Sequence, residues 1–165
     1  MKITDIKLRN LSGVMEVDGP FMEDRLVQPS DVYEEFRKSG GPARGQQIDD
    51  THFRVSGIYV QIETDDGVTG VSGPLMPSVG YHVWLQRDRL IGRDPMATEF
   101  LWDIMHRTAA HGRQGEPMMA ISAIDVALWD LKGKALGIPV YSLIGGPTQK
   151  SMPAYASMLG YTSVD

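Results

Sequence analysis

The chain has 165 residues and a mass of 18.2 kDa, and 42% of its residues are hydrophobic. This is enough for one globular domain with a core, and the spread of apolar residues excludes a disordered chain. Lys and Arg number 16 against 21 Asp and Glu, so the net charge of −5 argues against a nucleic-acid partner. The absence of cysteine excludes disulfides, thiolate catalysis and zinc–thiolate sites.

Membrane and export signals are also lacking in the sequence. No run of about 18 apolar residues is present, and the first five residues carry a lysine and an aspartate rather than an apolar signal core. We therefore expect a cytoplasmic protein that binds neither membranes nor nucleic acid.

Two stretches predict a small antiparallel sheet. Residues 2–11 alternate apolar and charged side chains, as a strand does, although Ile3 is out of phase. Residues 58–63 alternate in the same way and are followed by an Asp-Asp-Gly turn at 65–67, whose glycine can adopt a positive φ. Residues 68–72 return as the partner strand, so a hairpin is expected to join the N-terminal strand in one sheet.

The segment 12–54 is rich in Gly and Pro and has few apolar periods, which predicts a long, mostly irregular loop. A short helix over 32–38, capped by Ser30 and Asp31, is the one regular element expected within it. Such a segment is either a mobile surface excursion or a lid over a binding site, and its composition does not separate the two interpretations.

Helices are predicted over residues 83–91 and 96–108, after a loop rich in Pro, Ser and Gly at 75–81. Gly and Pro in the breaks between them are typical helix terminators. In the second helix one buried stripe is expected, made of Phe100, Leu101, Ile104 and Met105.

The clearest helix begins at Pro117 and ends before Gly137, with a proline beyond, which is typical of a helix stop. A last short strand is predicted over 152–158, after a Gly-Gly-Pro turn. An antiparallel sheet followed by helices places the chain in the α+β class. The apolar residues that share one face of the long helix are Ile121, Ile124, Leu128, Leu131 and Ala135.

Polar residues of the long helix give no catalytic constellation. Asp125 lies at the edge of the apolar face, where it is either a ligand or base or, as we favour, a structural acid bonded to amides or a neighbouring side chain. Asp130 and Lys134 are four residues apart and predict a surface ion pair. Lys132 and Lys134 point about 200° apart on a helix, so they cannot converge on one substrate atom.

The usual metal and nucleophile motifs are absent as well. The histidines, at positions 52, 82, 106 and 111, are never three or four residues apart, so no helical metal pair is predicted. Adjacent acids, as at 49–50 and 65–66, diverge unless a special loop turns both towards one cation. No nucleophile elbow or phosphate-binding glycine loop is present, so no catalytic residue and no metal ligand is assigned.

Charged side chains in the 12–54 segment are better candidates for binding. A guanidinium holds a carboxylate with two parallel hydrogen bonds, and a lid closing over an acidic small molecule would use such groups. Solvated loop charges are the alternative interpretation. The segment contains Arg25, Arg37, Arg44 and Arg54 together with Asp24, and the candidate substrate-binding residues are Glu23, Arg25, His52 and Arg54.

The long helix and its flank carry a specific motif. Residues 120–134 read AISAIDVALWDLKGK, and residues 136–146 read LGIPVYSLIGG. This run resembles the end of the capping domain of the enolase superfamily, in the mandelate racemase and muconate lactonizing branch. The hairpin at 59–70 and the opening residues 1–4 fit the same domain, and residues 21–33 more loosely resemble a loop of rhamnonate dehydratases and related acid-sugar enzymes.

The resemblance implies an α+β cap packed on a (β/α) barrel, with the catalytic site at the ends of the barrel strands. It also implies a Mg²⁺ ion, held by three carboxylates, that stabilises the enediolate formed when a base removes the proton next to a substrate carboxylate. In the dehydratases a β-hydroxyl then leaves as water. The cap loops, expected here at 12–54 and 75–81, would close over the sugar acid and exclude water.

The chain is too short for the whole of such an enzyme. A barrel usually takes about 250 residues, whereas the residues after Gly146 suffice for one barrel strand. We therefore predict an enolase-like capping domain over 1–146 and the start of an incomplete barrel over 147–165. The family's metal carboxylates and catalytic residues have no counterpart in the chain, so we expect it to be inactive alone, with Mg²⁺ bound only in the complete enzyme.

The predicted function is the capping and specificity portion of a Mg²⁺-dependent acid-sugar dehydratase. Its expected partners are the remainder of the barrel and a sugar acid, and the resemblance implies a homo-oligomer. A racemase or epimerase of the same branch is the alternative among enzymes. A non-catalytic binding or assembly module is the alternative from another class, and it would leave apolar residues such as Leu143 and Ile144 exposed.

Overall fold

A computed structural model of the chain describes residues 1–17, 29–37, 45–112 and 114–155. The chain forms two compact units, which we call unit 1 (Met1–Leu11 with Gly57–Lys150) and unit 2 (Ser12–Ser56 with Ser151–Asp165). No helix in these described ranges is long and apolar enough to cross a membrane. The domain boundary at residue 146 stays a prediction.

The sheet is built around the long strand β3 (His52–Thr64). It is a neighbour of β1 (Ile3–Glu16) and pairs antiparallel with β2 (Gly45–Gln47) and β4 (Thr69–Leu75). The predicted hairpin is confirmed, and Gly67 in its turn has a φ of 80°. The N-terminal strand is longer than predicted, since β1 continues past residue 11 to Glu16.

The prediction of an irregular 12–54 segment is wrong in three described places. β1 extends into it, β2 lies within it, and β3 begins at His52. The helix predicted over 32–38 is not formed in its described part, residues 32–37, either. Two short 3₁₀ turns, η1 (Pro29–Val32) and η2 (Glu34–Phe36), occupy this region and are separated by Tyr33 in an extended conformation. So short a stretch gains too few hydrogen bonds to support an α-helix by itself.

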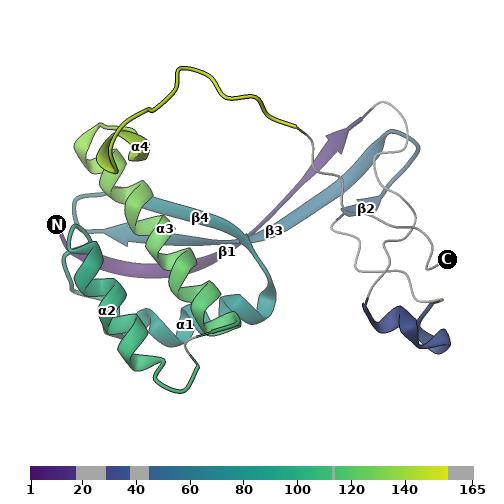
Figure 1. The fold of residues 1–165 in the computed structure, drawn as a ribbon, viewed down its shortest axis with the longest axis horizontal. Coiled ribbons are helices and arrows are strands. Elements are labelled where there is room, and N and C mark those ends of the chain that lie inside the picture. Colours follow the sequence, from purple (N-terminus) through teal and green to yellow (C-terminus); the bar gives the residue numbers. More distant parts are fainter. Residues whose placement is uncertain (18–28, 38–44, 113, 156–165) are drawn as a thin grey trace. The chain divides into compact units, whose positions relative to one another are not determined.

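The remainder of unit 1 is helical (Figure 1). The predicted loop at 75–81 is wrong, because α1 begins at Pro77, where a proline gives up no helical hydrogen bond. The end of α3 at the left-handed Gly137 confirms the predicted stop. The strand predicted over 152–158 is not formed in its described part, since residues 151–155 have no regular structure. The helices are α1 (Pro77–Leu90), α2 (Thr98–Thr108), α3 (Glu116–Leu136) and α4 (Val140–Leu143).

The hydrophobic core of unit 1 lies between the sheet and the helices, and α3 packs on β4, α1 and α2 (Figure 1). The predicted buried face of α3 is confirmed except for Ala135, which is exposed in its last turn. In α2, Leu101 and Met105 are buried as predicted, but Phe100 is 55% exposed and lies beneath the Arg93 guanidinium. The core side chains include Ile6, Val60, Ile62, Val83, Leu101, Met105, Ile121, Ile124, Leu128 and Leu131.

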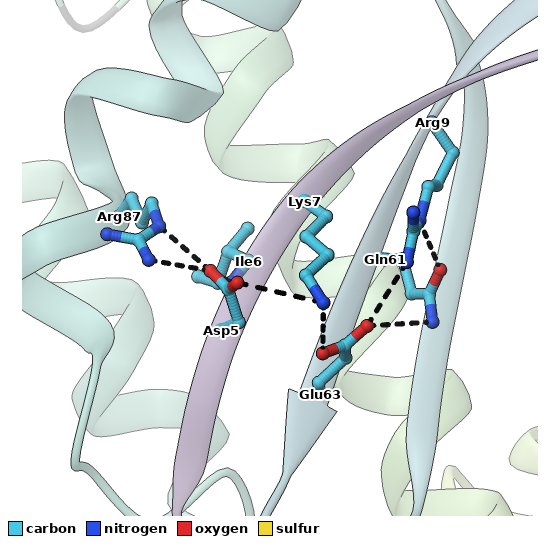
Figure 2. Close-up of polar contacts among 7 residues, drawn as sticks. All are labelled: Asp5, Ile6, Lys7, Arg9, Gln61, Glu63 and Arg87. Carbon is cyan, nitrogen blue, oxygen red and sulfur yellow. Dashed lines mark hydrogen bonds and ion pairs between the residues drawn. The ribbon is translucent and has the colours of Figure 1, made fainter.

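The residues of β1 and β3 that alternate with the core carry a network of charges (Figure 2). The Arg87 guanidinium of α1 donates to Asp5, at 2.7 and 2.9 Å. The Lys7 ammonium donates to Glu63 at 2.6 Å, which joins β1 to β3. Arg9 donates to the same carboxylate at 3.3 Å and to Gln61 at 2.9 Å. Ion pairs therefore join β1 to β3 and to α1.

Candidate functional site

The structure describes two of the four candidate binding residues. Glu23 and Arg25 lie outside the described residues, as do Asp24 and Arg44. His52 is the first residue of β3, and Arg54 is exposed on the same strand, opposite Gln46 of β2.

The turn before β3 is organised by one carboxylate. Asp49 Oδ1 accepts the backbone N–H of Thr51 at 2.9 Å and that of His52 at 2.8 Å. It also lies 2.8 Å from His52 Nδ1, so that nitrogen donates to the carboxylate and Nε2 is left for another partner. The sequence contains the Asp and His of this turn, but not the backbone geometry that brings their side chains together.

The same contacts shift the pKa values of both groups. The N–H of Thr51 and the His52 side chain together lower the pKa of Asp49 to about 2. The hydrogen bond with Asp49 raises the pKa of His52, and the nearby Glu16 carboxylate adds to this effect. His52 therefore keeps its positive charge to a higher pH than a free histidine does.

His52 and Arg54 form a pair on one face of β3, because residues two apart on a strand point to the same side. Phe53 between them points the other way and is buried. Strand spacing thus places an imidazole and a guanidinium on one face of β3, and both groups can donate hydrogen bonds to an anion.

The structure shows the surroundings of two acids of α3, Asp125 and Asp130. Asp125 is half buried, and desolvation, with a smaller effect from Glu99, raises its pKa. None of the described residues donates a hydrogen bond to Asp125, so the bonding partners expected of a structural acid are not found among them. The ion pair of Asp130 with Lys134 is confirmed at 2.6 Å, and Asp130 also accepts the N–H of Val71 at 2.8 Å, which ties α3 to β4.

A polar cluster that the sequence did not predict lies where the N-termini of α1 and α3 meet. Ser78 Oγ donates to Glu116 Oε1 at 2.6 Å, and His82 Nε2 is 3.9 Å from Glu116 Oε2. Glu116 is 38 positions from Ser78 and 34 from His82 in the sequence, so no spacing motif could have joined it to them.

A metal site cannot be assigned to this part of the molecule. Among the described residues no group of three His, Asp or Glu side chains is close enough to hold a metal ion. The described side chains therefore do not form a Mg²⁺ site of the three-carboxylate kind.

Comparison with known proteins assigns most of the chain to a family. The profile of the mandelate racemase / muconate lactonizing enzyme N-terminal domain matches residues 49–145, which is more than half of the chain. A D-galactonate dehydratase of Ralstonia pickettii (strain 12J) is 40% identical over 114 residues, which cover 66% of this chain and 29% of that protein.

Solved structures give the same result for the fold. A member of the enolase superfamily from Salmonella Typhimurium is similar with a TM-score of 0.57 and 33% identity, covering 63% of this chain and 29% of that one. An isomerase from Streptomyces coelicolor A3(2) has a TM-score of 0.58 and 28% identity, covering 90% of this chain and 33% of that one. The chain thus spans about a third of the length of these relatives or less. It belongs to the mandelate racemase / muconate lactonizing enzyme family of the enolase superfamily and corresponds to the N-terminal capping domain.

Proposed function

We propose that this chain is the capping and specificity portion of an enzyme that dehydrates a sugar acid. The observation that carries the proposal is the 40% identity over 114 residues with a D-galactonate dehydratase. Because the match covers 29% of that relative, the residues that perform the chemistry are proposed to lie in a barrel formed by other residues. Members of the superfamily generally use Mg²⁺, which would be held there rather than by the described residues.

The role proposed for this chain is to bind the substrate and exclude water. His52 and Arg54 share one face of β3, and both suit the carboxylate of a sugar acid. Asp49 would fix the orientation of the His52 ring through the 2.8 Å contact. Glu23 and Arg25, from the same segment, are proposed to contact the same substrate.

The experiment is an assay of a complete polypeptide that contains this chain, with Mg²⁺, against a library of sugar acids in D₂O. Proton NMR reports exchange next to the carboxylate and appearance of a keto acid in the same sample. A keto acid from one or a few sugar acids supports dehydration, and we expect the 165-residue chain alone to give none.

The alternative activity is racemisation or epimerisation, which the similarity to the Streptomyces isomerase favours. It would appear as exchange and inversion next to the carboxylate without keto acid, and this result would overturn the dehydratase proposal. Absence of both reactions with every sugar acid would instead favour a non-catalytic binding or assembly module.

A further inference from the structure

Helix α1 carries exposed aromatic side chains on the side that faces away from the core. Val79 and Val83 of this helix are buried, whereas Tyr81 and Trp84 are 59% and 61% exposed and stack with their ring centroids 6.4 Å apart. Leu85 lies beside them on the helix and is 40% exposed. Single exposed apolar side chains are common on protein surfaces, but neighbours on one helix face form a continuous apolar surface.

Strand β1 extends this surface at one side of the helix. Leu8 of β1 is 39% exposed, and a Cβ placed on Gly80 of α1 would lie 3.3 Å from Leu8 Cδ1. Gly80 and Trp84 are one helical turn apart, so Leu8 borders the helix next to the aromatic rings. We call Leu8, Tyr81, Trp84 and Leu85 the α1 patch, and all four belong to unit 1.

The size of the α1 patch suits an interface between proteins. A Tyr or Trp side chain can bury about 150–250 Å², so rings exposed to this extent leave roughly 200–300 Å² of aromatic surface in solvent. Two copies of the patch in contact would bury about twice that area, which is about a third of a standard interface of about 1,600 Å². The leucines and the polar residues around the patch would supply the remainder.

One flank of the α1 patch has charges of opposite sign at its two ends. Residues 78, 82, 85 and 89 lie along this flank, because they follow one another in steps of three or four. At the first end, Glu116 accepts a hydrogen bond from Ser78 at 2.6 Å and is still 45% exposed. At the other end, Arg89 is exposed, and none of the described acids forms an ion pair with it. A rise of 1.5 Å per residue places the two ends about 16 Å apart.

This distribution of charge is complementary to itself under a two-fold rotation. A two-fold axis through the centre of the patch sets two α1 helices antiparallel, with the same surface of each copy in contact. Arg89 of one copy then lies at the Ser78 end of the other, beside Glu116, and the same contact forms twice. Parallel helices would instead bring like charges together, which is unfavourable.

We propose that this chain forms a homodimer through the α1 patch, with the α1 helices antiparallel and Arg89 of each copy paired with Glu116 of the other. The exposed apolar residues Tyr141 and Ile144 form a separate surface on α4. α4 follows the C-terminal end of α3, whereas Glu116, at the N-terminal end of α3, lies beside α1 (Figure 1). The dimer does not depend on the reaction proposed above, because it needs only residues of unit 1.

The first test is sedimentation of the 165-residue chain over a range of micromolar concentrations. We expect a monomer–dimer equilibrium with a micromolar Kd. Trp84→Glu places a charge within the patch of both copies, so it should raise Kd at least about hundredfold while the circular dichroism spectrum stays that of the parent. Ile144→Glu on α4 replaces another exposed apolar side chain and is the matched control, which should leave Kd unchanged.

Two outcomes of this experiment would overturn the proposal. One is a parent chain that stays monomeric up to hundreds of micromolar, which would leave the patch to a different partner. The other is association that persists in Trp84→Glu and is lost in Ile144→Glu, which would place the contact on α4.

The second test examines the charge pairing by mixing two variants. In a homodimer of Arg89→Glu two acids meet at each end, and in a homodimer of Glu116→Arg two bases meet, so each variant alone should have a Kd raised about tenfold or more. A heterodimer of the two variants has one acid and one base at each end. The mixture should therefore return to within about threefold of the parent Kd, which a variant that had merely lost its fold could not do. A mixture that associates no better than either variant would overturn the antiparallel pairing.

Discussion

The carboxylate of Asp49 accepts hydrogen bonds from two backbone N–H groups and from the His52 ring, so a single residue fixes the start of β3. Its neighbour Arg54 is an exposed side chain on the same strand. At the scale of the residue, the candidate site therefore combines His52, whose ring is oriented by Asp49, with Arg54, whose side chain is exposed to solvent.

The first prediction concerns pH. A raised His52 pKa means that the contact with Asp49 stabilises the turn fully below the ordinary value of 6.5 and is lost as pH rises through the higher folded-state value. A lowered Asp49 pKa acts in the opposite direction, since its contribution is present above 3.8 and is lost as pH falls towards about 2. Hydrogen exchange corrected for intrinsic rates should therefore show the greatest protection of the Thr51 and His52 amides between about pH 3.8 and 6.5.

The variant Asp49→Asn tests the cause of this effect. It removes the negative charge, so an NMR titration should give a lower pKa for His52 than in the original chain. Asp66→Asn is the matched control, because Asp66 is an exposed turn residue that contacts the N-terminal amine rather than His52. A His52 pKa that does not change in Asp49→Asn would show that the contact has no electrostatic role.

The second prediction concerns substrate binding. In a complete polypeptide that turns over a sugar acid, Arg54→Ala should lower kcat/KM by about 10- to 100-fold, since a hydrogen bond to a charged group contributes about 1.5–3 kcal/mol. Arg107→Ala, at another exposed arginine, should leave kcat/KM unchanged. If Arg54→Ala behaved like this control, Arg54 would be a solvated surface charge.

At the scale of the element, β4 and α3 meet at a glycine. Gly70 is buried, and a Cβ placed on it would overlap the Ala127 carbonyl oxygen and lie 2.7 Å from Leu131 Cβ. The absence of a side chain therefore sets how closely the helix approaches the strand.

The third prediction follows from this contact. Gly70→Ala should lower the free energy of unfolding by about 3 kcal/mol, because backbone atoms must move apart to admit the methyl group. Urea denaturation measures the change. Gly13→Ala in β1 is the control, since nothing lies within 4 Å of its added Cβ, and it should change stability by less than about 0.5 kcal/mol. Equal stability of the two variants would contradict the packing described here.

The elements that the sequence predicts correctly are those marked by a pattern within their own residues. The hairpin of β3 and β4 has both strand alternation and an Asp-Asp-Gly turn, and α3 has both an apolar face and a glycine stop, so each was found correctly. The start of α1 was missed because the Pro, Ser and Gly of residues 75–81 suit a loop and a first helical turn equally well. Exposure of Phe100 depends on which neighbours α2 meets, and no periodicity within α2 contains that information.

At the scale of the whole molecule, unit 1 is assembled around one helix. α3 contacts β4, α1, α2 and α4, and it supplies much of the core. The candidate site could be predicted only in part, because His52 and Arg54 follow from residue type and strand spacing, whereas the backbone geometry that brings Asp49 to His52 does not.

The fourth prediction is that α3 decides whether unit 1 folds. A chain of residues 1–115 lacks α3 and should lose the near-UV circular dichroism and the cooperative urea transition of the parent. A chain of residues 1–150 keeps every residue of unit 1 and should retain both. A cooperative transition in the 1–115 chain would show that the remaining elements form a core without α3.

The place of α3 in the sequence also has a consequence for protein synthesis. The sheet residues of unit 1 and the helices α1 and α2 are all translated before α3, yet the apolar faces of α1, α2 and β4 are buried against it. On the ribosome these faces therefore stay uncovered until residues 116–136 have left the exit tunnel. During that interval the nascent chain exposes apolar surface that α3 later covers.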